Sequence, residues 1–182
     1  QEGRPPYHRP PVSKGILLGS KKAEDTACKD EDFYRDHRIV LETGVSGKSL
    51  DPAGREVTLD DGRVLSYEKL LLATGSRARR LPVPGADLQG IHILRTLDDA
   101  LALVNAMKGT RAAVVIGGSY IGAESASALA QNGIRTTMVF PEERLLTGLT
   151  DPDFGRYLHS LYEKHQVAIL THRKPTRFNG QG

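Results

Sequence analysis

Residues 114–124 contain the sequence Val-Val-Ile-Gly-Gly-Ser-Tyr-Ile-Gly-Ala-Glu, a glycine-rich turn that follows a run of β-branched apolar residues. The β-branched run predicts a buried strand, and the small and apolar residues after the glycines favour a helix. A second strand is predicted at residues 135–140, within the roughly thirty residues that a dinucleotide-binding βαβ unit requires. The stretch therefore predicts an α/β fold with a parallel sheet and a nucleotide site at the turn.

Each position of the turn has a physical reason to bind a dinucleotide. Gly117 allows the tight turn, and Gly122 lets helix and strand pack closely. The free backbone N–H groups at the helix start and the helix dipole favour a pyrophosphate there. Ser119 replaces the middle glycine of the usual pattern, but it is small and donates a hydrogen bond. A plain glycine turn in an ordinary βαβ unit is the alternative. The candidate NAD-binding residues here are Gly117, Gly118, Ser119, Tyr120, Ile121 and Gly122.

The remainder of the second half alternates strands and helices. Thr96 with Asp99 three residues later resembles a capping box and predicts a helix through about Met107. Further helices are predicted at residues 121–131 and 152–165, and strands at 91–94, 112–116, 135–140 and 167–171.

The first half has a different pattern. Prolines within residues 5–11 predict a stiff extended loop or a late helix entry. The apolar run within residues 67–75 has no alternation, so we expect a strand buried on both faces. Residues 76–89 form an irregular connector and the predicted domain boundary. A short helix is predicted at residues 30–37, a strand at 38–43, and a β-meander at 47–50, 56–59 and 64–67 with a turn at 60–62.

Composition excludes several classes of protein. The chain has 182 residues, with 25 Lys and Arg against 22 Asp and Glu, so its net charge is only +3. There is no Trp, and no aromatic residue lies within the basic cluster at residues 77–80, so no nucleic-acid partner is expected. No apolar run reaches the roughly 18–20 residues of a membrane span. Cys28 is the only cysteine, which excludes a disulfide scaffold, a multi-cysteine metal site and an internal redox dithiol. No metal site is predicted.

Several separated segments are similar to one enzyme family. They are residues 6–15, 72–76, 81–86, 94–100 and 139–142, together with the glycine turn. On these segments the chain resembles the FAD-dependent pyridine-nucleotide oxidoreductases, and most of all the branch of ferredoxin and rubredoxin reductases, monodehydroascorbate reductase and the apoptosis-inducing-factor proteins. The resemblance implies two Rossmann-like dinucleotide-binding domains with a small β-meander, and FAD and NAD(P)H as cofactors.

Against the family pattern, both expected domains are incomplete in this chain. Residues 1–95 resemble an FAD-binding domain without its first βαβ unit, and residues 96–182 resemble an NAD(P)H-binding domain without its C-terminal part. The resemblance therefore suggests an internal piece of a larger enzyme, which alone holds FAD poorly or not at all.

The resemblance also assigns candidate FAD contacts. A guanidinium such as Arg9 is well suited to pair with a diphosphate, and ligands bind where buried strands such as the one ending at Thr74 and Gly75 finish. A glycine such as Gly47 lets its backbone approach the adenine. The alternatives are a solvated arginine and a plain strand end. The full implied set is Glu2, Arg9, Lys14, Gly47, Ala73, Thr74, Gly75 and Arg95.

Lys14 and Glu124 are the predicted catalytic pair. In the relatives that this chain resembles they correspond to a buried ion pair beside the reactive edge of the flavin, where a lysine stabilises the reduced, anionic ring and the carboxylate holds the lysine. The alternative is a surface lysine and a first-turn acid favoured by the helix dipole.

The electron acceptor stays open. Because Cys28 is alone, the family resemblance implies direct transfer to an external acceptor: a ferredoxin or rubredoxin, a quinone, a monodehydroascorbate-type radical or oxygen. Two other hypotheses are a redox-responsive protein similar to apoptosis-inducing factor and a purely structural nucleotide-binding domain. We expect a cytoplasmic protein, with an organellar location and the oligomeric state left open.

Glu142 predicts the preferred nicotinamide cofactor. It lies twenty residues after Gly122, where an acid accepts hydrogen bonds from the adenosine ribose and repels a 2′-phosphate. Phe140 occupies the strand end, and Pro141 turns the chain so that Glu142 reaches the ribose. Arg144 could bind a 2′-phosphate and weaken the discrimination, and a solvated turn is the alternative. We expect NADH to be preferred.

Overall fold

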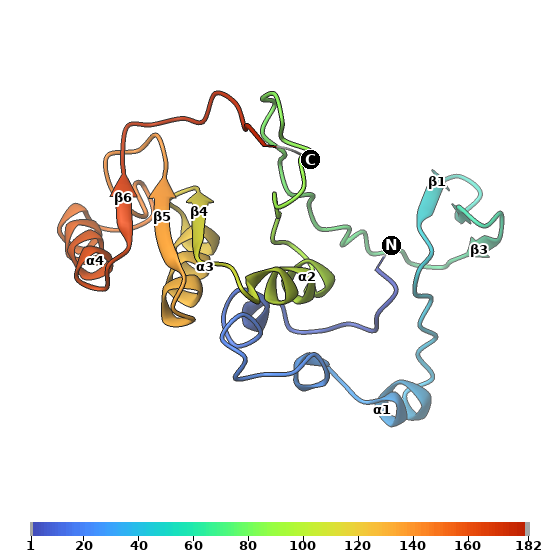
Figure 1. Ribbon diagram of the computed structural model, residues 1–182. Helices are drawn as coiled ribbons and strands as arrows, with labels where there is room; N and C mark the ends of the chain where they lie inside the picture. The colour runs from blue at the N-terminus through green and yellow to red at the C-terminus, as the bar shows by residue number, and fades with distance from the viewer. Residues whose placement is uncertain (1, 181–182) are drawn as a thin grey trace. The chain divides into compact units, whose positions relative to one another are not determined.

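The computed structural model describes residues 2–180. Its strands form two separate three-stranded sheets, β1–β2–β3 and β4–β5–β6, which confirms the α/β class. In chain order the elements are η1 (Pro10–Ser13), η2 (Glu24–Thr26), α1 (Glu31–Asp36), β1 (Gly47–Asp51), β2 (Glu56–Leu59), β3 (Val64–Ser66), α2 (Leu97–Met107), β4 (Ala112–Ile116), α3 (Tyr120–Gln131), β5 (Arg135–Val139), α4 (Pro152–Lys164) and β6 (Ala168–Leu170) (Figure 1).

The chain divides into two compact units. Unit 1 comprises Gln1–His8 and Ala27–Ser76, and unit 2 comprises Arg9–Thr26 and Arg77–Gly182. Residues 9–26 and 77–95 therefore belong to the same compact unit as the C-terminal part of the chain. The predicted cofactor domains, in contrast, divide the chain after residue 95. Compactness does not say which cofactor a unit binds, so that assignment stays a prediction. Residue 1 and residues 181–182, at the ends of the predicted ranges, lie outside the described residues.

Unit 2 contains a parallel βαβαβ sheet. β4 pairs with β5 from Ala112 opposite Arg135 to Ile116 opposite Val139, and β5 pairs with β6. α3 connects β4 to β5, and α4 connects β5 to β6, as parallel neighbours require (Figure 1). Both helices pack on one core, because Leu158 and Tyr162 of α4 contact the same buried cluster as residues of α3 and β5. That cluster is Ala126, Met138, Phe140, Leu145, Leu146 and Val167.

The predicted capping box at the start of α2 is confirmed. The Thr96 hydroxyl accepts a hydrogen bond from the Asp99 N–H at 3.1 Å, and the Asp99 carboxylate accepts one from the Thr96 N–H at 2.7 Å. Two orphan N–H groups of the helix start are satisfied by this exchange.

The proline-rich start has the late helix entry that was one of the two predicted alternatives, because residues 5–9 precede the short helix η1. η1 has prolines at its first two positions, where the missing N–H groups would have no helical partner in any case. Val12 and Ser13 of η1 are buried. The Asn132 side-chain amide, at the end of α3, donates to the Leu17 carbonyl at 3.1 Å. This segment is therefore an integral part of unit 2.

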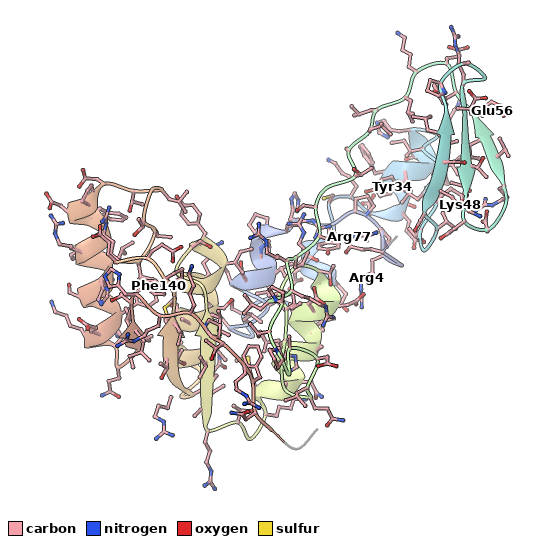
Figure 2. The ribbon with its side chains drawn as sticks, turned by 90° about the horizontal axis from the view of Figure 1, so that it is seen from above. Arg4, Tyr34, Lys48, Glu56, Arg77 and Phe140 are labelled. Atoms are coloured by element: carbon pink, nitrogen blue, oxygen red, sulfur yellow. The ribbon has the colours of Figure 1, made fainter. Side chains whose placement is uncertain are left out.

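Unit 1 is built around the predicted meander. β2 pairs antiparallel with β1 and β3, and the turn between β2 and β3 includes Gly62 with a φ of +90°. Figure 2 shows the side chains of this sheet, with Lys48 and Glu56 labelled. The Arg63 guanidinium donates to both carboxylate oxygens of Glu42, at 2.9 and 2.8 Å.

Three predicted strands, at residues 38–43, 67–75 and 91–94, are wrong for the described structure. All three segments are irregular, and neither sheet includes them. Leu71 is 87% exposed and Val40 is 82% exposed, so the expected burial on both faces is also absent. A strand exists only through ladder hydrogen bonds to a neighbour, and apolar sequence alone does not supply that neighbour.

Candidate functional site

The glycine turn has the geometry that the sequence predicted. Gly117 has a φ of +123°, a backbone conformation that residues other than glycine rarely adopt. At Gly122 an added Cβ would lie 2.1 Å from the Gly117 carbonyl oxygen. Glycine is therefore required at both positions, for backbone conformation at the first and for close packing at the second.

The N-terminus of α3 fits a pyrophosphate. Ser119 is the N-cap residue, yet its side chain makes no capping hydrogen bond, and the first turn carries no acid. The first N–H groups of a helix have no partner within the helix, and the dipole gives this end a partial positive charge. A Cβ built at Gly117 would meet nothing within 4 Å, so the backbone beside the helix start is open. Tyr120 and Ile121 are 53% and 47% exposed.

Gly118 has a packing role that the sequence did not reveal. A Cβ at this position would lie 2.8 Å from the ring of Phe140, which is fully buried. The Gly118 carbonyl also accepts a hydrogen bond from the Leu146 N–H at 2.8 Å. Phe140, labelled in Figure 2, directly follows β5. Phe140 thus supports the turn from the core side.

Glu142 lies at the carboxyl edge of the parallel sheet. Its carbonyl accepts a hydrogen bond from the His172 N–H at 3.3 Å, while the Arg173 N–H donates to Phe140 at 3.1 Å. The segments that follow β5 and β6 therefore run side by side at this edge. The Glu142 side chain is exposed, in agreement with a ligand contact or with the solvated-turn alternative.

Arg144, the residue that could weaken the discrimination between NADH and NADPH, is largely buried. Its side chain is only 14% exposed, and its guanidinium pairs with Glu143. A Cβ at Gly155 of α4 would lie 3.0 Å from the Arg144 Cδ, so the arginine stem packs across this glycine. These contacts hold the loop after β5 against α4, while the buried Nε of Arg144 has no hydrogen-bond partner among the described residues.

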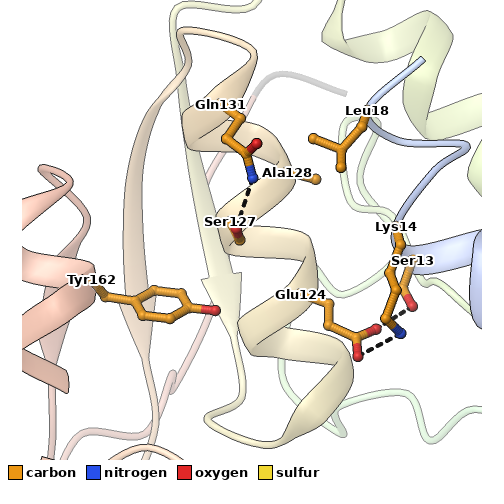
Figure 3. Close-up of a pocket in the computed structure, with 8 residues that line it drawn as sticks. All are labelled: Ser13, Lys14, Leu18, Glu124, Ser127, Ala128, Gln131 and Tyr162. Carbon is orange, nitrogen blue, oxygen red and sulfur yellow. Dashed lines mark hydrogen bonds and ion pairs between the residues drawn. The ribbon is translucent and has the colours of Figure 1, made fainter. Parts of the chain in front are cut away.

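Lys14 and Glu124, separated by more than a hundred residues in the sequence, meet in unit 2. The Lys14 Nζ lies 2.7 Å from the Glu124 Oε1, and the Ser13 hydroxyl donates to the Glu124 Oε2 at 2.5 Å (Figure 3). The pairing agrees with the implied ion pair. The expected burial of the pair is not observed, because the Lys14 and Glu124 side chains are 52% and 27% exposed.

These residues line a small pocket of about 150 Å³ between η1, α3 and α4. Tyr162 points into it from α4, and its hydroxyl donates to the Ala123 carbonyl at 3.0 Å (Figure 3). Burial raises the pKa of the Tyr162 phenol, and the negative charge of Glu124 raises it further. The phenol therefore stays protonated and remains a hydrogen-bond donor.

Within unit 2, the structure also brings two candidate FAD contacts together. The Arg9 guanidinium donates to the Arg95 carbonyl at 3.0 Å, and the Arg95 N–H donates to the Asp99 carboxylate at 3.0 Å. Arg9 is thereby linked to the start of α2. A guanidinium held in this way is a suitable donor for a phosphate.

The remaining FAD candidates lie in unit 1. The Glu2 carboxylate accepts a hydrogen bond from the Tyr7 hydroxyl at 2.5 Å, and Gly47 opens β1 opposite Leu59. Ala73, Thr74 and Gly75 are in an irregular, exposed segment, where Gly75 has a φ of +68°. The sequence predicted that Ala73–Gly75 lie at a strand end, and unit 1 has no strand there.

Sequence reasoning named only Lys14 and Glu124 among the pocket residues; Ser13 and Tyr162 are two of those that it missed. Ser13 directly precedes Lys14, so the only available signal was its position beside a candidate catalytic residue. Tyr162 lies on a helix whose apolar face gives no indication of a site, and only the packing of α4 on α3 reveals it.

An open helix start after a parallel strand, followed by an acid after the next strand, defines the class of dinucleotide-binding α/β proteins. The family described as pyridine nucleotide-disulphide oxidoreductase matches residues 1–182, and the chain belongs to this family. Membership implies FAD and NAD(P)H as cofactors, and the open N-terminus of α3 fits the pyrophosphate of such a dinucleotide.

Named relatives and a solved structure are similar over most of the chain. Rubredoxin-NAD(+) reductase of Pseudomonas putida is 33% identical over 181 residues, which cover 100% of this chain and 47% of the relative. Peroxisomal monodehydroascorbate reductase 2 of Oryza sativa subsp. japonica is 37% identical over an alignment of 180 positions that covers 91% of this chain and 38% of the relative. The crystal structure of a ferredoxin reductase from Rhodopseudomonas palustris superposes with a TM-score of 0.95 at 31% identity, covering 100% of this chain and 45% of that one.

The chain spans less than half the length of these relatives, 38% of rhodocoxin reductase of Rhodococcus erythropolis and 47% of the rubredoxin reductase. In the described part of the chain, no helix combines the length and apolar character that crossing a membrane requires.

Proposed function

We propose that the protein containing this chain is a flavin-dependent NAD(P)H oxidoreductase that transfers electrons from NADH to an external acceptor. FAD, when bound, supplies the chemistry that accepts a hydride from a nicotinamide and releases electrons to an acceptor. The observation that carries the proposal is the contact of the Lys14 ammonium with the Glu124 carboxylate at 2.7 Å, in the same unit as the glycine turn.

Lys14 and Glu124 have complementary roles in this proposal. An ammonium beside the reactive edge of a flavin stabilises the negative charge that develops there on reduction. The Glu124 carboxylate holds the ammonium in place, and α3 carries this carboxylate less than two turns from its N-terminus, where Gly122 and its neighbours would hold the NADH pyrophosphate. One helix would thus serve both the binding of NADH and the positioning of Lys14.

The chain's remaining candidates would hold the two dinucleotides. The α3 N-terminus would take the NADH pyrophosphate and Glu142 its adenosine ribose. Arg9, supported by the Arg95 carbonyl, would pair with the FAD diphosphate. The remaining proposed FAD contacts are Glu2, Gly47, Ala73, Thr74, Gly75 and the Arg95 side chain.

We favour a small iron–sulfur protein as the acceptor. The relatives named above include a ferredoxin reductase and a rubredoxin reductase, although another is a monodehydroascorbate reductase. Cys28 is the only cysteine of the chain, so these residues supply no dithiol relay. A cytoplasmic location is part of the proposal and is tested by cell fractionation.

The test uses the intact protein. We expect it to purify with visible flavin absorbance, which NADH bleaches under anaerobic conditions. Turnover with ferredoxin, rubredoxin, a quinone and monodehydroascorbate, measured in parallel, then identifies the acceptor. A colourless protein, or bound flavin that NADH reduces no faster than free FAD, would contradict the proposed function.

A further inference from the structure

Ser13 occupies an unusual position beside the Lys14–Glu124 ion pair. It is the last residue of η1 and only 8% exposed, while Lys14 directly after it is 52% exposed. Both side chains reach the same carboxylate: the Ser13 hydroxyl donates to Oε2 at 2.5 Å, and the Lys14 Nζ lies 2.7 Å from Oε1 (Figure 3). Each oxygen of Glu124 is therefore held by one of two consecutive residues.

The two contacts differ in how well they can fix geometry. An ion pair with a half-exposed lysine competes with water and is screened by salt, so it contributes little rigidity. A hydrogen bond from a buried hydroxyl to a carboxylate is charge-assisted and shielded from water. The Ser13 contact is thus the stronger restraint on the rotation of the Glu124 carboxylate, and the carboxylate orientation sets where the Lys14 ammonium lies.

Other groups facing Glu124 do not replace this restraint. Tyr162 faces it from α4, but its hydroxyl donates to the Ala123 carbonyl at 3.0 Å. On α3 itself, Ser127 lines the same pocket, and its hydroxyl accepts a hydrogen bond from the Gln131 amide at 3.0 Å.

We propose that Ser13 is a positioning residue for flavin reduction: its hydroxyl fixes the Glu124 carboxylate, which fixes the Lys14 ammonium where reduced flavin gains negative charge. This inference rests on the proposed function. Without the hydroxyl the carboxylate rotates freely, the ammonium samples more positions, and stabilisation of the reduced flavin weakens. FAD binding itself does not depend on this contact.

The test compares Ser13→Ala with Ser127→Ala in the intact, flavin-loaded protein. Both remove a serine hydroxyl from the same pocket, but only Ser13→Ala removes a bond to Glu124. We expect Ser13→Ala to reduce the limiting rate of flavin reduction by NADH about tenfold, as loss of a hydrogen bond to a charged group allows, with an unchanged half-saturating NADH concentration. Ser127→Ala retains the wild-type rate, and Ser13→Thr, which keeps the hydroxyl, restores it.

The second readout is the midpoint potential of the bound flavin, measured by dithionite titration without turnover. We expect a more negative potential in Ser13→Ala, since a tenfold weaker reduction equilibrium corresponds to about 30 mV for a two-electron couple. If Ser13→Ala does not fold, Ser13→Cys, with its weaker donor, takes its place.

The outcomes separate the two proposals. Equal rates and potentials in Ser13→Ala and Ser127→Ala, with flavin still reduced by NADH, would overturn the role of Ser13 and leave the proposed function intact. Failure of NADH to reduce the wild-type flavin would contradict the function, and the potentials would still decide whether Ser13 stabilises the reduced ring.

Discussion

Two segments of this chain, residues 135–140 and residues 67–75, are predicted strands, but only the first of them contains a strand. β5 lies between β4 and β6, and its Met138 is fully buried. Residues 67–75 include three consecutive leucines, yet Leu71 is 87% exposed and the segment pairs with neither sheet. β4, which pairs with β5, leads into the glycine turn. Residues 67–75 end in the candidate FAD contacts Thr74 and Gly75.

The difference shows that an apolar run is not sufficient for a buried strand, and β5, which reads Arg-Thr-Thr-Met-Val, shows that a long apolar run is not required either. β5 has a hydrogen-bonded neighbour on each edge and helices packed on its side chains, so its backbone and its apolar surface are both satisfied. Residues 67–75 have neither within the described chain. A nucleotide site built on strand ends needs the sheet first, and only the glycine turn has one here.

We expect the largest effect when the chain is divided into two fragments, one with residues 67–75 and the other with β5. We expect residues 1–95 expressed alone to bind a hydrophobic dye and to show no cooperative thermal transition, because the apolar run at 67–75 is unpaired and η1 loses its contact with α3. Residues 96–182 keep the parallel sheet and are the comparison; they should melt cooperatively, at a lower temperature than the whole chain because they lack the η1 segment. Circular dichroism and dye fluorescence measure both. A sharp melt of residues 1–95 without dye binding would show that they form a complete domain.

The contrast between Met138 and Leu71 is sharpened by truncating each. In the 182-residue chain, Met138→Ala should lower the free energy of unfolding by about 2–5 kcal/mol through the cavity it leaves. Leu71→Ala should cost less than about 0.5 kcal/mol, as at other exposed positions. Chemical denaturation gives both values, and equal losses would refute the contrast. In the intact protein, a cost for Leu71→Ala close to that of Met138→Ala would show that another segment covers Leu71 there.

Gly122→Ala tests the close packing of the turn. The added Cβ would lie 2.1 Å from the Gly117 carbonyl oxygen, so we expect a loss of about 1–3 kcal/mol in stability and weaker NADH binding. Gly3→Ala is the control, because nothing lies within 4 Å of its Cβ position. Stability and NADH titration are measured together. Unchanged NADH affinity in Gly122→Ala would argue against the turn as the pyrophosphate site.

Substitutions of Lys14 and Glu124 test whether unit 2, which contains β5, also takes part in flavin reduction. Lys14→Met and Glu124→Gln should each slow flavin reduction by about tenfold to a hundredfold, the cost of losing a hydrogen bond to a charged group, while FAD stays bound. Lys22→Met serves as a control for the loss of one positive charge. Stopped-flow reduction of the intact protein by NADH gives the rates. If both variants are reduced at the wild-type rate, the pair is structural.

The smallest effect concerns the residue after β5. We expect NADH to be preferred over NADPH by about tenfold in kcat/KM, a difference near 1.4 kcal/mol, and Glu142→Ala to abolish most of this preference. Glu163→Ala, in the last turn of α4 before the amino end of β6, controls for the loss of a negative charge. The same NADH-to-NADPH ratio in wild type and Glu142→Ala would remove Glu142 from the site.

The sequence predicted the elements whose causes are local or periodic. The Thr96–Asp99 capping box, the meander with its turn at residues 60–62, and the three parallel strands with their helices are all present. Local sequence failed at residues 38–43 and 67–75, because strand formation depends on a partner that composition does not reveal.

For the candidate site, the sequence predicted several of the residues but few of the contacts between them. Gly117 and Gly122 were predictable, since backbone conformation and close approach restrict those positions to glycine whatever surrounds them. The Ser13 contact, the support of Gly118 by Phe140 and the packing of Arg144 across Gly155 each join residues of different segments. Only the tertiary structure decided them, because a side chain's partner depends on which elements the fold brings together.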